Sequence, residues 1–93
     1  MRKIRHTNRF KHDYKREKAG RQNKTLDVAL MEVVTMLAAD TPLPRNKFDH
    51  PLSGEWSDYR DCHVKPDLVL IYRKPDDEHL GLVRLGSHSE IGL

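Results

Sequence analysis

The sequence of 93 residues contains one cysteine, Cys62. A single cysteine cannot close an internal disulfide, and it cannot supply the two thiolates of a CxxC metal or redox motif. Both kinds of site are therefore excluded, and the compartment is expected to be reducing. The position of Cys62 in an alternating segment indicates a small buried residue and not a nucleophile.

Long apolar runs are also missing. None approaches the roughly 18–20 residues that a membrane-spanning helix needs, and Met1 leads into a polar segment without the apolar core of a signal peptide. We therefore expect a soluble, cytoplasmic protein. The short length predicts one domain over residues 1–93 with a single small core and no internal cofactor site, so that no cofactor is expected.

Acidic residues are scarce at the N-terminal end. Residues 1–24 contain ten Lys and Arg against two acids, although the net charge of the whole chain is only +3. A basic surface of this kind favours binding to nucleic acid through its phosphates. The alternative is an ordinary solvated helix with a charged surface.

Two helices are predicted in the first half of the chain. In the first, Thr7-Asn8 provides an N-cap, Phe10 and Tyr14 share one face, and Gly20 ends the helix. The second begins after Thr25 and carries apolar residues at helical spacing, so it is expected to be the main core helix, with Met31 and Met36 as packing residues. The prolines in residues 40–44 end it.

The second half predicts β-strands. From Trp56 onward the pattern has a period of two, which sends Asp61 and His63 to one face and Cys62 and Val64 to the other. Apolar runs at residues 68–72 and 80–85 predict two further strands, and residues 2–6 could add one at the margin of the sheet. The expected fold class is α+β: a short N-terminal strand, two helices, then three antiparallel strands in one sheet.

Histidines at polar positions mark the candidate site. The unperturbed pKa of histidine, about 6.5, allows proton transfer near neutrality, and neighbouring arginines can bind an anion. On pattern alone, each histidine could equally be a surface residue. Period two could also send one of the two arginines to the opposite face of the sheet. The candidates are His50, in a loop, His63, Asp61, Asp67 and His88, with Arg60 and Arg84 for the anion.

Two other classes of function compete with acid/base catalysis. Three histidines and an aspartate could form a zinc-like site, although the tight ligand pairs of such sites, as in HExxH, are missing. The chain could also be a non-catalytic basic module that binds RNA or the ribosome. No helix-turn-helix or RNA-recognition sheet motif is present to favour that alternative.

Four segments carry a resemblance to a known family. The chain resembles the YafQ-type branch of the RelE toxin superfamily in His50-Pro51-Leu52-x-Gly54-x-Trp56, Tyr59-Arg60-Asp61-x-His63-Val64-x-Pro66-Asp67, Leu70-Ile71-Tyr72 and Gly86-Ser87-His88. The resemblance implies a bacterial type II toxin that cleaves mRNA in the ribosomal A site. It implies catalytic roles for His50, His63, Asp67 and His88, with Asp61 in support. The tail, Ile91-Gly92-Leu93, departs from the family because it lacks an aromatic residue.

The resemblance also implies partners and a mechanism. The expected partners are mRNA on the ribosome, with the 16S rRNA of the A site, and a cognate antitoxin that carries a DNA-binding N-terminal domain. The expected reaction is metal-independent attack by the RNA 2′-OH, since two imidazoles suffice for the proton transfers. The basic first helix is expected to face ribosomal RNA through Arg16, Lys18 and Arg21.

Overall fold

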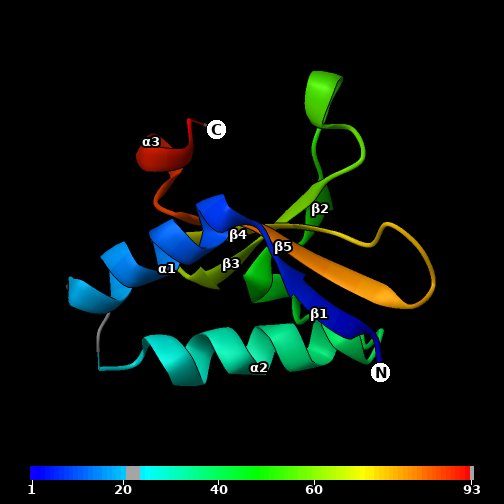
Figure 1. Cartoon of the computed structure of the whole chain (residues 1–93), viewed down its shortest axis with the longest axis horizontal. Coiled ribbons are helices and arrows are strands. Elements are labelled where there is room, and N and C mark those ends of the chain that lie inside the picture. Colours follow the sequence, from blue (N-terminus) through cyan, green and yellow to red (C-terminus); the bar gives the residue numbers. More distant parts are fainter. Residues whose placement is uncertain (21–23, 93) are drawn as a thin grey trace.

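The computed structural model describes residues 1–20 and 24–92, and it confirms the α+β class (Figure 1). Two short 3-10 helices, η1 and η2, accompany the main elements. In chain order the elements are β1 (Lys3–His6), α1 (Asn8–Ala19), α2 (Leu26–Ala38), η1 (Arg45–Lys47), β2 (His50–Pro51), η2 (Gly54–Trp56), β3 (Arg60–Lys65), β4 (Leu68–Arg73), β5 (His79–Gly86) and α3 (His88–Ile91). None of these described helices is long and apolar enough to cross a membrane.

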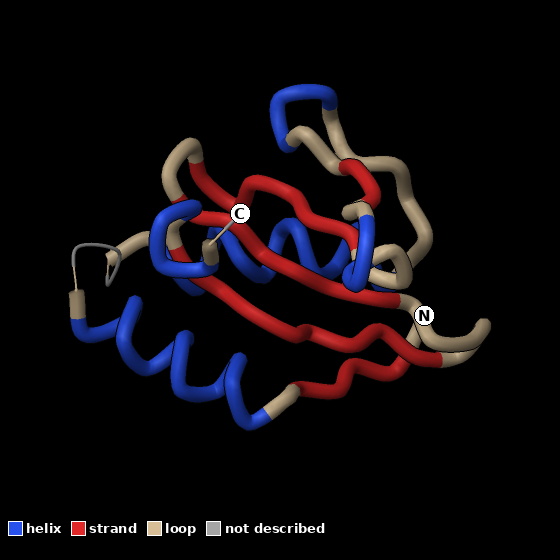
Figure 2. Tube along the Cα trace, turned by 90° about the horizontal axis from the view of Figure 1, so that it is seen from above, coloured by secondary structure: helices blue, strands red, loops and turns tan. Residues whose placement is uncertain are grey.

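The strands form one sheet in the order β1-β5-β4-β3-β2 (Figure 2). The three predicted strands, β3, β4 and β5, are antiparallel neighbours as expected. The N-terminal strand β1 lies at the margin and runs parallel to β5. The sequence analysis missed β2, a two-residue strand that pairs with β3, because two residues are too few to show a period.

One face of the sheet is covered by α2, while α3 and η2 lie on the other side (Figure 1). The apolar stripe of α2 packs against the inward residues of the strands, and Phe10 of α1 completes the core. The members of α2 in this core are Leu26, Leu30, Val33, Val34, Leu37 and Ala38. The expected helical periodicity is therefore confirmed.

Two details of the sequence analysis are wrong. Met31 was expected to pack, but it is 62% exposed, because it lies beyond the edge of the buried stripe of α2. The strand expected from Trp56 begins only at Arg60, since Gly54–Trp56 form the 3-10 helix η2. Gly54 opens η2 with a φ of 65°, a conformation that favours glycine.

The ends of α1 follow the prediction. The Thr7 hydroxyl accepts the Phe10 N–H at 2.9 Å and donates to the Val83 carbonyl at 2.8 Å, so the cap also ties the helix to β5. At the other end, the N–H of Gly20 donates to the carbonyl of Glu17. The start of α1 is thereby fixed against the strand that leads into the candidate site.

Candidate functional site

The candidate site lies on the sheet face opposite the α2 core. Alternation along β3 turns Cys62 and Val64 into the core, whereas Asp61 and His63 point to the other face, as predicted. The register then places His50 opposite Asp61, Asp61 opposite Ile71, and Ile71 opposite Arg84. One row across four strands thus contains a histidine, an aspartate and an arginine.

His50 was expected in a loop, but it belongs to β2. The backbone pairing between His50 and Asp61 fixes its position, and its side chain remains 54% exposed. Its Nδ1 lies 2.7 Å from the carbonyl oxygen of Phe48 and 3.0 Å from Oδ1 of Asp61. Both neighbours are acceptors, so Nδ1 carries a proton, and in the neutral ring Nε2 holds the lone pair.

Asp61 lies beneath this histidine and is 3% exposed. Its Oδ1 makes no hydrogen bond within the described part of the chain, because the contact with His50 is close but poorly aligned. Burial raises the pKa of Asp61, and the positive charges of His50, His63 and His88 oppose that rise. All three histidines therefore interact with one buried carboxylate, which was predicted only as a supporting residue.

His63 and His88 approach each other across the face. Their ring centroids are 5.0 Å apart, and the Phe48 ring centroid lies 5.1 Å from that of His63. His88 is the first residue of α3, whose start carries a capping box. Ser87 Oγ accepts the Glu90 N–H at 3.2 Å, and the Glu90 carboxylate accepts the Ser87 N–H at 3.0 Å. This capped turn, and not the strand end alone, positions His88.

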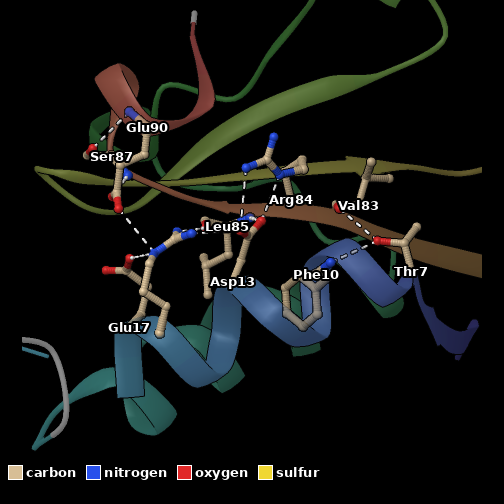
Figure 3. Close-up of polar contacts among 10 residues, drawn as sticks. Thr7, Phe10, Asp13, Glu17, Val83, Arg84, Leu85, Ser87 and Glu90 are labelled. Atoms are coloured by element: carbon tan, nitrogen blue, oxygen red, sulfur yellow. Dashed lines mark hydrogen bonds and ion pairs between the residues drawn. The ribbon is translucent and has the colours of Figure 1, made fainter. Parts of the chain in front are cut away.

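Arg84 is anchored by Asp13 of α1, which the sequence analysis missed. Asp13 is 2% exposed and accepts Arg84 Nε at 2.8 Å and the Leu85 N–H at 3.0 Å (Figure 3). Burial opposes ionisation of Asp13, but the hydrogen bonds from Arg84 and Leu85 and the charge of Arg84 outweigh it and lower the pKa. The available signal was the spacing i, i+3, i+4 of Phe10, Asp13 and Tyr14, which places Asp13 on the inward stripe.

The guanidinium of Arg16 is engaged by other groups of the protein. Its guanidinium lies 2.9 Å from Asp13, 3.0 Å from Glu17 and 3.1 Å from Glu90, and it donates to the Leu85 carbonyl at 2.9 Å. A Cβ at Gly86 would lie 2.9 Å from Arg16 Nη2, so a larger residue there would displace the end of the Arg16 side chain. Arg16 therefore links α1 to α3. Its predicted contact with ribosomal RNA stays a prediction.

Arg60 lies on the opposite face from Asp61. It pairs with Asp49 at 3.2 Å, and Asp49 also accepts the Tyr72 hydroxyl at 2.6 Å. Burial and the Asp49 hydrogen bond raise the pKa of Tyr72. Arg60 and Arg84 therefore lie on opposite faces of the sheet, an outcome that the period of two had allowed. Arg60 forms a structural ion pair with Asp49 on the face away from Asp61.

The remaining predicted residues lie around the margin. Asp67 is exposed in the β3–β4 turn and lines a hollow of about 360 Å³ with Ser87 and Ser89, the neighbours of His88. Lys18 pairs with Asp27 at 2.6 Å. Arg21 lies outside the described residues. The assignments of these residues to catalysis or RNA binding stay predictions.

The metal and thiol alternatives can be compared with this geometry. Among residues 1–20 and 24–92, no three His, Cys, Asp or Glu side chains form a group that could hold a metal ion. Cys62 is buried, and burial raises the pKa of its thiol to about 12. The thiolate needed for nucleophilic attack is therefore disfavoured, which agrees with the prediction of a buried packing residue.

An apolar hollow lies away from the three candidate histidines, although His6 forms part of its lining. It has a volume of about 480 Å³ and lies between α1, α2 and the β1 side of the sheet. Its apolar lining residues are Ile4, Phe10, Tyr14, Leu30, Met31, Val34 and Leu82, and Ile4 and Met31 are exposed. An exposed apolar surface of this kind is typical of a site for a protein partner.

Comparisons with known proteins match almost the whole chain. A family model described as "Bacterial toxin of type II toxin-antitoxin system, YafQ" matches residues 2–92. The mRNA interferase toxin YafQ of Escherichia coli strain B / BL21-DE3 is 38% identical over 92 residues, covering 98% of this chain and 96% of that protein. The putative toxin YafQ of Haemophilus influenzae is 49% identical over 55 residues, which cover 56% of this chain and about half, 54%, of that protein.

Solved structures extend the match to the fold. A copper-bound mutant toxin from Helicobacter pylori has a TM-score of 0.86 at 38% identity, covering 98% of this chain and 99% of that one. A chain of the Escherichia coli DinJ-YafQ toxin-antitoxin complex has a TM-score of 0.82 at 35% identity, covering 97% and 96%. This chain therefore belongs to the YafQ family of bacterial toxins of type II toxin–antitoxin systems.

Proposed function

We propose that this protein is an endoribonuclease that cleaves mRNA in the A site of the translating ribosome and thereby inhibits translation. The observation that carries the proposal is the set of three histidines around buried Asp61, beside an anchored arginine on the same face. The related proteins named mRNA interferase toxins support the substrate class.

The geometry favours His50 as the general base. Its Nδ1 proton faces Phe48 and Asp61, so the exposed Nε2 accepts the proton of the RNA 2′-OH. The 2′-oxygen then attacks the adjacent phosphorus. Asp61 stabilises the imidazolium that results, because the new positive charge lies beside its buried carboxylate.

The general acid comes from the other side of the face. His88, on its capped turn, donates a proton to the departing 5′-oxygen as the bond from phosphorus to that oxygen breaks. The products are a 2′,3′-cyclic phosphate and a 5′-hydroxyl, and no oxidant or further reactant is consumed. His63, whose ring contacts those of Phe48 and His88, orients the acid, and Asp67 supports the same end of the site.

Arg84 supplies positive charge for the phosphate. It lies two strands from Asp61, or roughly 10 Å along the row, which leaves room for a phosphate between them. Its pairing with Asp13 uses Nε and Nη2, and Figure 3 shows one guanidinium nitrogen pointing away from Asp13. Asp13 thus aims Arg84 at the site and reduces the entropy lost on binding the phosphate.

The site contains few groups that could bend RNA into line for attack, which supports dependence on the ribosome. The exposed basic residues of α1 supply a surface for ribosomal RNA. When the toxin is inactive, a cognate antitoxin with a DNA-binding N-terminal domain covers it, with the apolar hollow between α1 and α2 as one contact. The DinJ-YafQ complex from Escherichia coli is a precedent for such a partner.

The test is to map mRNA 3′ ends on purified translating ribosomes with and without the protein. We expect new ends that carry a cyclic or 3′ phosphate, and no comparable cleavage of naked mRNA. Treating the protein with EDTA, and removing the chelator before the ribosomes are added, should leave the rate unchanged; this control matters because a Helicobacter pylori relative is copper-bound. Ends with a 3′-hydroxyl, or loss of activity after this pretreatment of the protein, would exclude the mechanism. Ribosome binding without cleavage would favour the non-catalytic module.

A further inference from the structure

Phe48 adopts an unusual backbone conformation beside the histidines. Its φ of 50° and ψ of 41° lie in the left-handed region, which among the described non-glycine residues only Asp40 shares. This region is costly for a bulky aromatic residue and cheaper for glycine or asparagine. Phe48 is also 60% exposed, so burial of the ring does little to offset the cost.

The backbone conformation has an evident role. It directs the Phe48 carbonyl oxygen to within 2.7 Å of His50 Nδ1, where it helps to fix the tautomer of that ring. Any residue supplies such a carbonyl, however, and glycine or asparagine would supply it with less strain. Orienting His50 therefore explains the backbone conformation of Phe48 but not its phenyl ring. A strained residue beside a functional site often has a function of its own.

The ring contacts a histidine of the catalytic face and also lines a hollow. Its centroid is 5.1 Å from that of His63, at an interplanar angle of 50°. The hollow has a volume of about 580 Å³ and lies between η1 and the turn after β3. It is lined by Asn46, Lys47, Phe48, His63 and residues 64–66. Two lysines in this lining carry positive charge: the Lys47 ammonium donates to the Val64 carbonyl at 3.3 Å, and the Lys65 ammonium donates to the Thr25 hydroxyl.

We propose that Phe48 is a stacking platform for the nucleobase next to the cleaved phosphodiester, and that the hollow is the subsite for that nucleotide. The proposal rests on the proposed function and deepens it. The Phe48 ring contacts His63, which in turn contacts His88. A base stacked on this ring would therefore belong to the nucleotide next to the phosphate at which His50 and His88 act. Stacking on an aromatic ring accommodates every base, and Lys47 and Lys65 complement the phosphate of the same nucleotide.

Phe48 is thus a positioning residue, and its ring can be tested apart from its backbone. Phe48→Asn keeps the left-handed conformation and removes the ring, Phe48→Leu keeps an apolar side chain without a π-face, and Phe48→Trp enlarges the platform. Val28→Gln is the matched control, since Val28 is an apolar side chain on α2 that is 75% exposed. Single-turnover mRNA cleavage on ribosomes is measured against toxin concentration and pH.

We expect Phe48→Asn and Phe48→Leu to lower cleavage efficiency by roughly 5- to 150-fold, the range that loss of one stacked base gives. Phe48→Trp should stay near wild type, as should Val28→Gln. The pH profile should keep both limbs, because the carbonyl that orients His50 is retained. The Phe48→Asn protein should melt no lower than wild type, since asparagine relieves backbone strain.

A binding measurement separates this proposal from the proposed function. The Phe48→Trp protein is titrated with 2′-O-methyl triadenylate, which lacks the 2′-OH and cannot be cleaved. We expect quenching of fluorescence beyond that of the wild type, whose single tryptophan is Trp56. Equal efficiency of all the Phe48 variants, with an actively cleaving wild type, would overturn the stacking role alone. If the wild type cleaves nothing, the proposed function fails, and the titration still decides whether a base stacks on residue 48.

Discussion

The Nδ1 atom of His50 lies 3.0 Å from Oδ1 of Asp61, and the two residues are opposed in the register of β2 and β3. The imidazole is more than half exposed, while the carboxylate beneath it is buried. A solvent-facing proton acceptor thus stands on a buried negative group that stabilises its charged form. Burial raises the pKa of the Asp61 carboxyl group, so keeping this group ionised destabilises the folded state.

The first prediction is that Asp61→Asn stabilises the fold and impairs cleavage. A raised pKa means that the ionised carboxylate destabilises the folded state, so the penalty is absent below about pH 4 and grows as pH rises through the folded pKa. We expect the variant to melt about 4–8 °C above wild type at pH 7–8, for an unsatisfied buried group worth about 1 kcal/mol. The difference in melting temperature between the variant and the wild type should disappear as pH falls towards 4.

Cleavage by Asp61→Asn should fall about 10²–10⁴-fold, because the His50 imidazolium loses its counter-charge. Asp58→Asn is the matched control, since Asp58 is an exposed aspartate in the turn before β3, and it should change neither melting nor rate. A gain in melting temperature that is equal at pH 4 and pH 8 would show that the effect is not electrostatic.

The second prediction concerns the proton-transfer pair. His50→Ala and His88→Ala should each lower single-turnover cleavage about 10²–10⁴-fold and abolish growth arrest, with melting close to wild type. A base must be neutral and an acid charged, so His50→Ala should flatten the acidic limb of the pH–rate profile and His88→Ala the alkaline limb. Losses for His63→Ala and Asp67→Ala should be comparable or smaller.

His12→Ala, at an exposed position on α1, is the control for loss of an imidazole. Single variants of His50 and His88 that both stay near wild type, with both limbs intact, would place the catalytic groups elsewhere on the sheet.

The third prediction is that Asp13→Ala destabilises the protein strongly. It removes the acceptor for Arg84, Arg16 and the Leu85 N–H together, and a broken buried ion pair costs about 3–5 kcal/mol. Because the pKa of Asp13 is lowered, its contribution is present above about pH 4 and is lost as pH falls through the folded pKa. The midpoint of urea unfolding measures the change.

Asp27→Ala is the matched control for Asp13→Ala. Asp27 is an exposed aspartate that pairs with Lys18, so its loss should shift the urea midpoint far less than Asp13→Ala does. A double-mutant cycle of Asp13 and Arg84 should show coupling of a kilocalorie or more, and additive single effects would mean that Asp13 does not anchor the arginine.

The fourth prediction is that α1 binds ribosomal RNA through its exposed basic residues. Arg16 and Lys18 are engaged in internal ion pairs, so the test uses Arg9, Lys11 and Lys15. Reversing all three to Glu should weaken ribosome binding and reduce the salt slope by about 0.7–0.9 per lost phosphate contact. The melting temperature should be unchanged. If ribosome affinity changes neither with salt concentration nor with these charge reversals, α1 is a solvated face or a surface for the antitoxin.

Periodicity and local chemistry determined much of this protein from the sequence alone. The spacing of Leu26, Leu30 and Val33 specified the core helix, and alternation along β3 separated Asp61 and His63 from Cys62, because side chains alternate strictly along a strand. Thr7 and Gly20 marked the ends of α1. These features depend on residues close together in the chain, so they can be predicted from the sequence.

Tertiary structure decided the partners across long sequence distances. The pairing of His50 with Asp61 depends on a two-residue strand that shows no period, and the pairing of Asp13 with Arg84 joins positions 71 residues apart. The separation of Arg60 from Arg84 required the strand register. The sequence does not show which group will pair with a given charged side chain. Those pairs are set by packing and burial, once the sheet and the helices have come together.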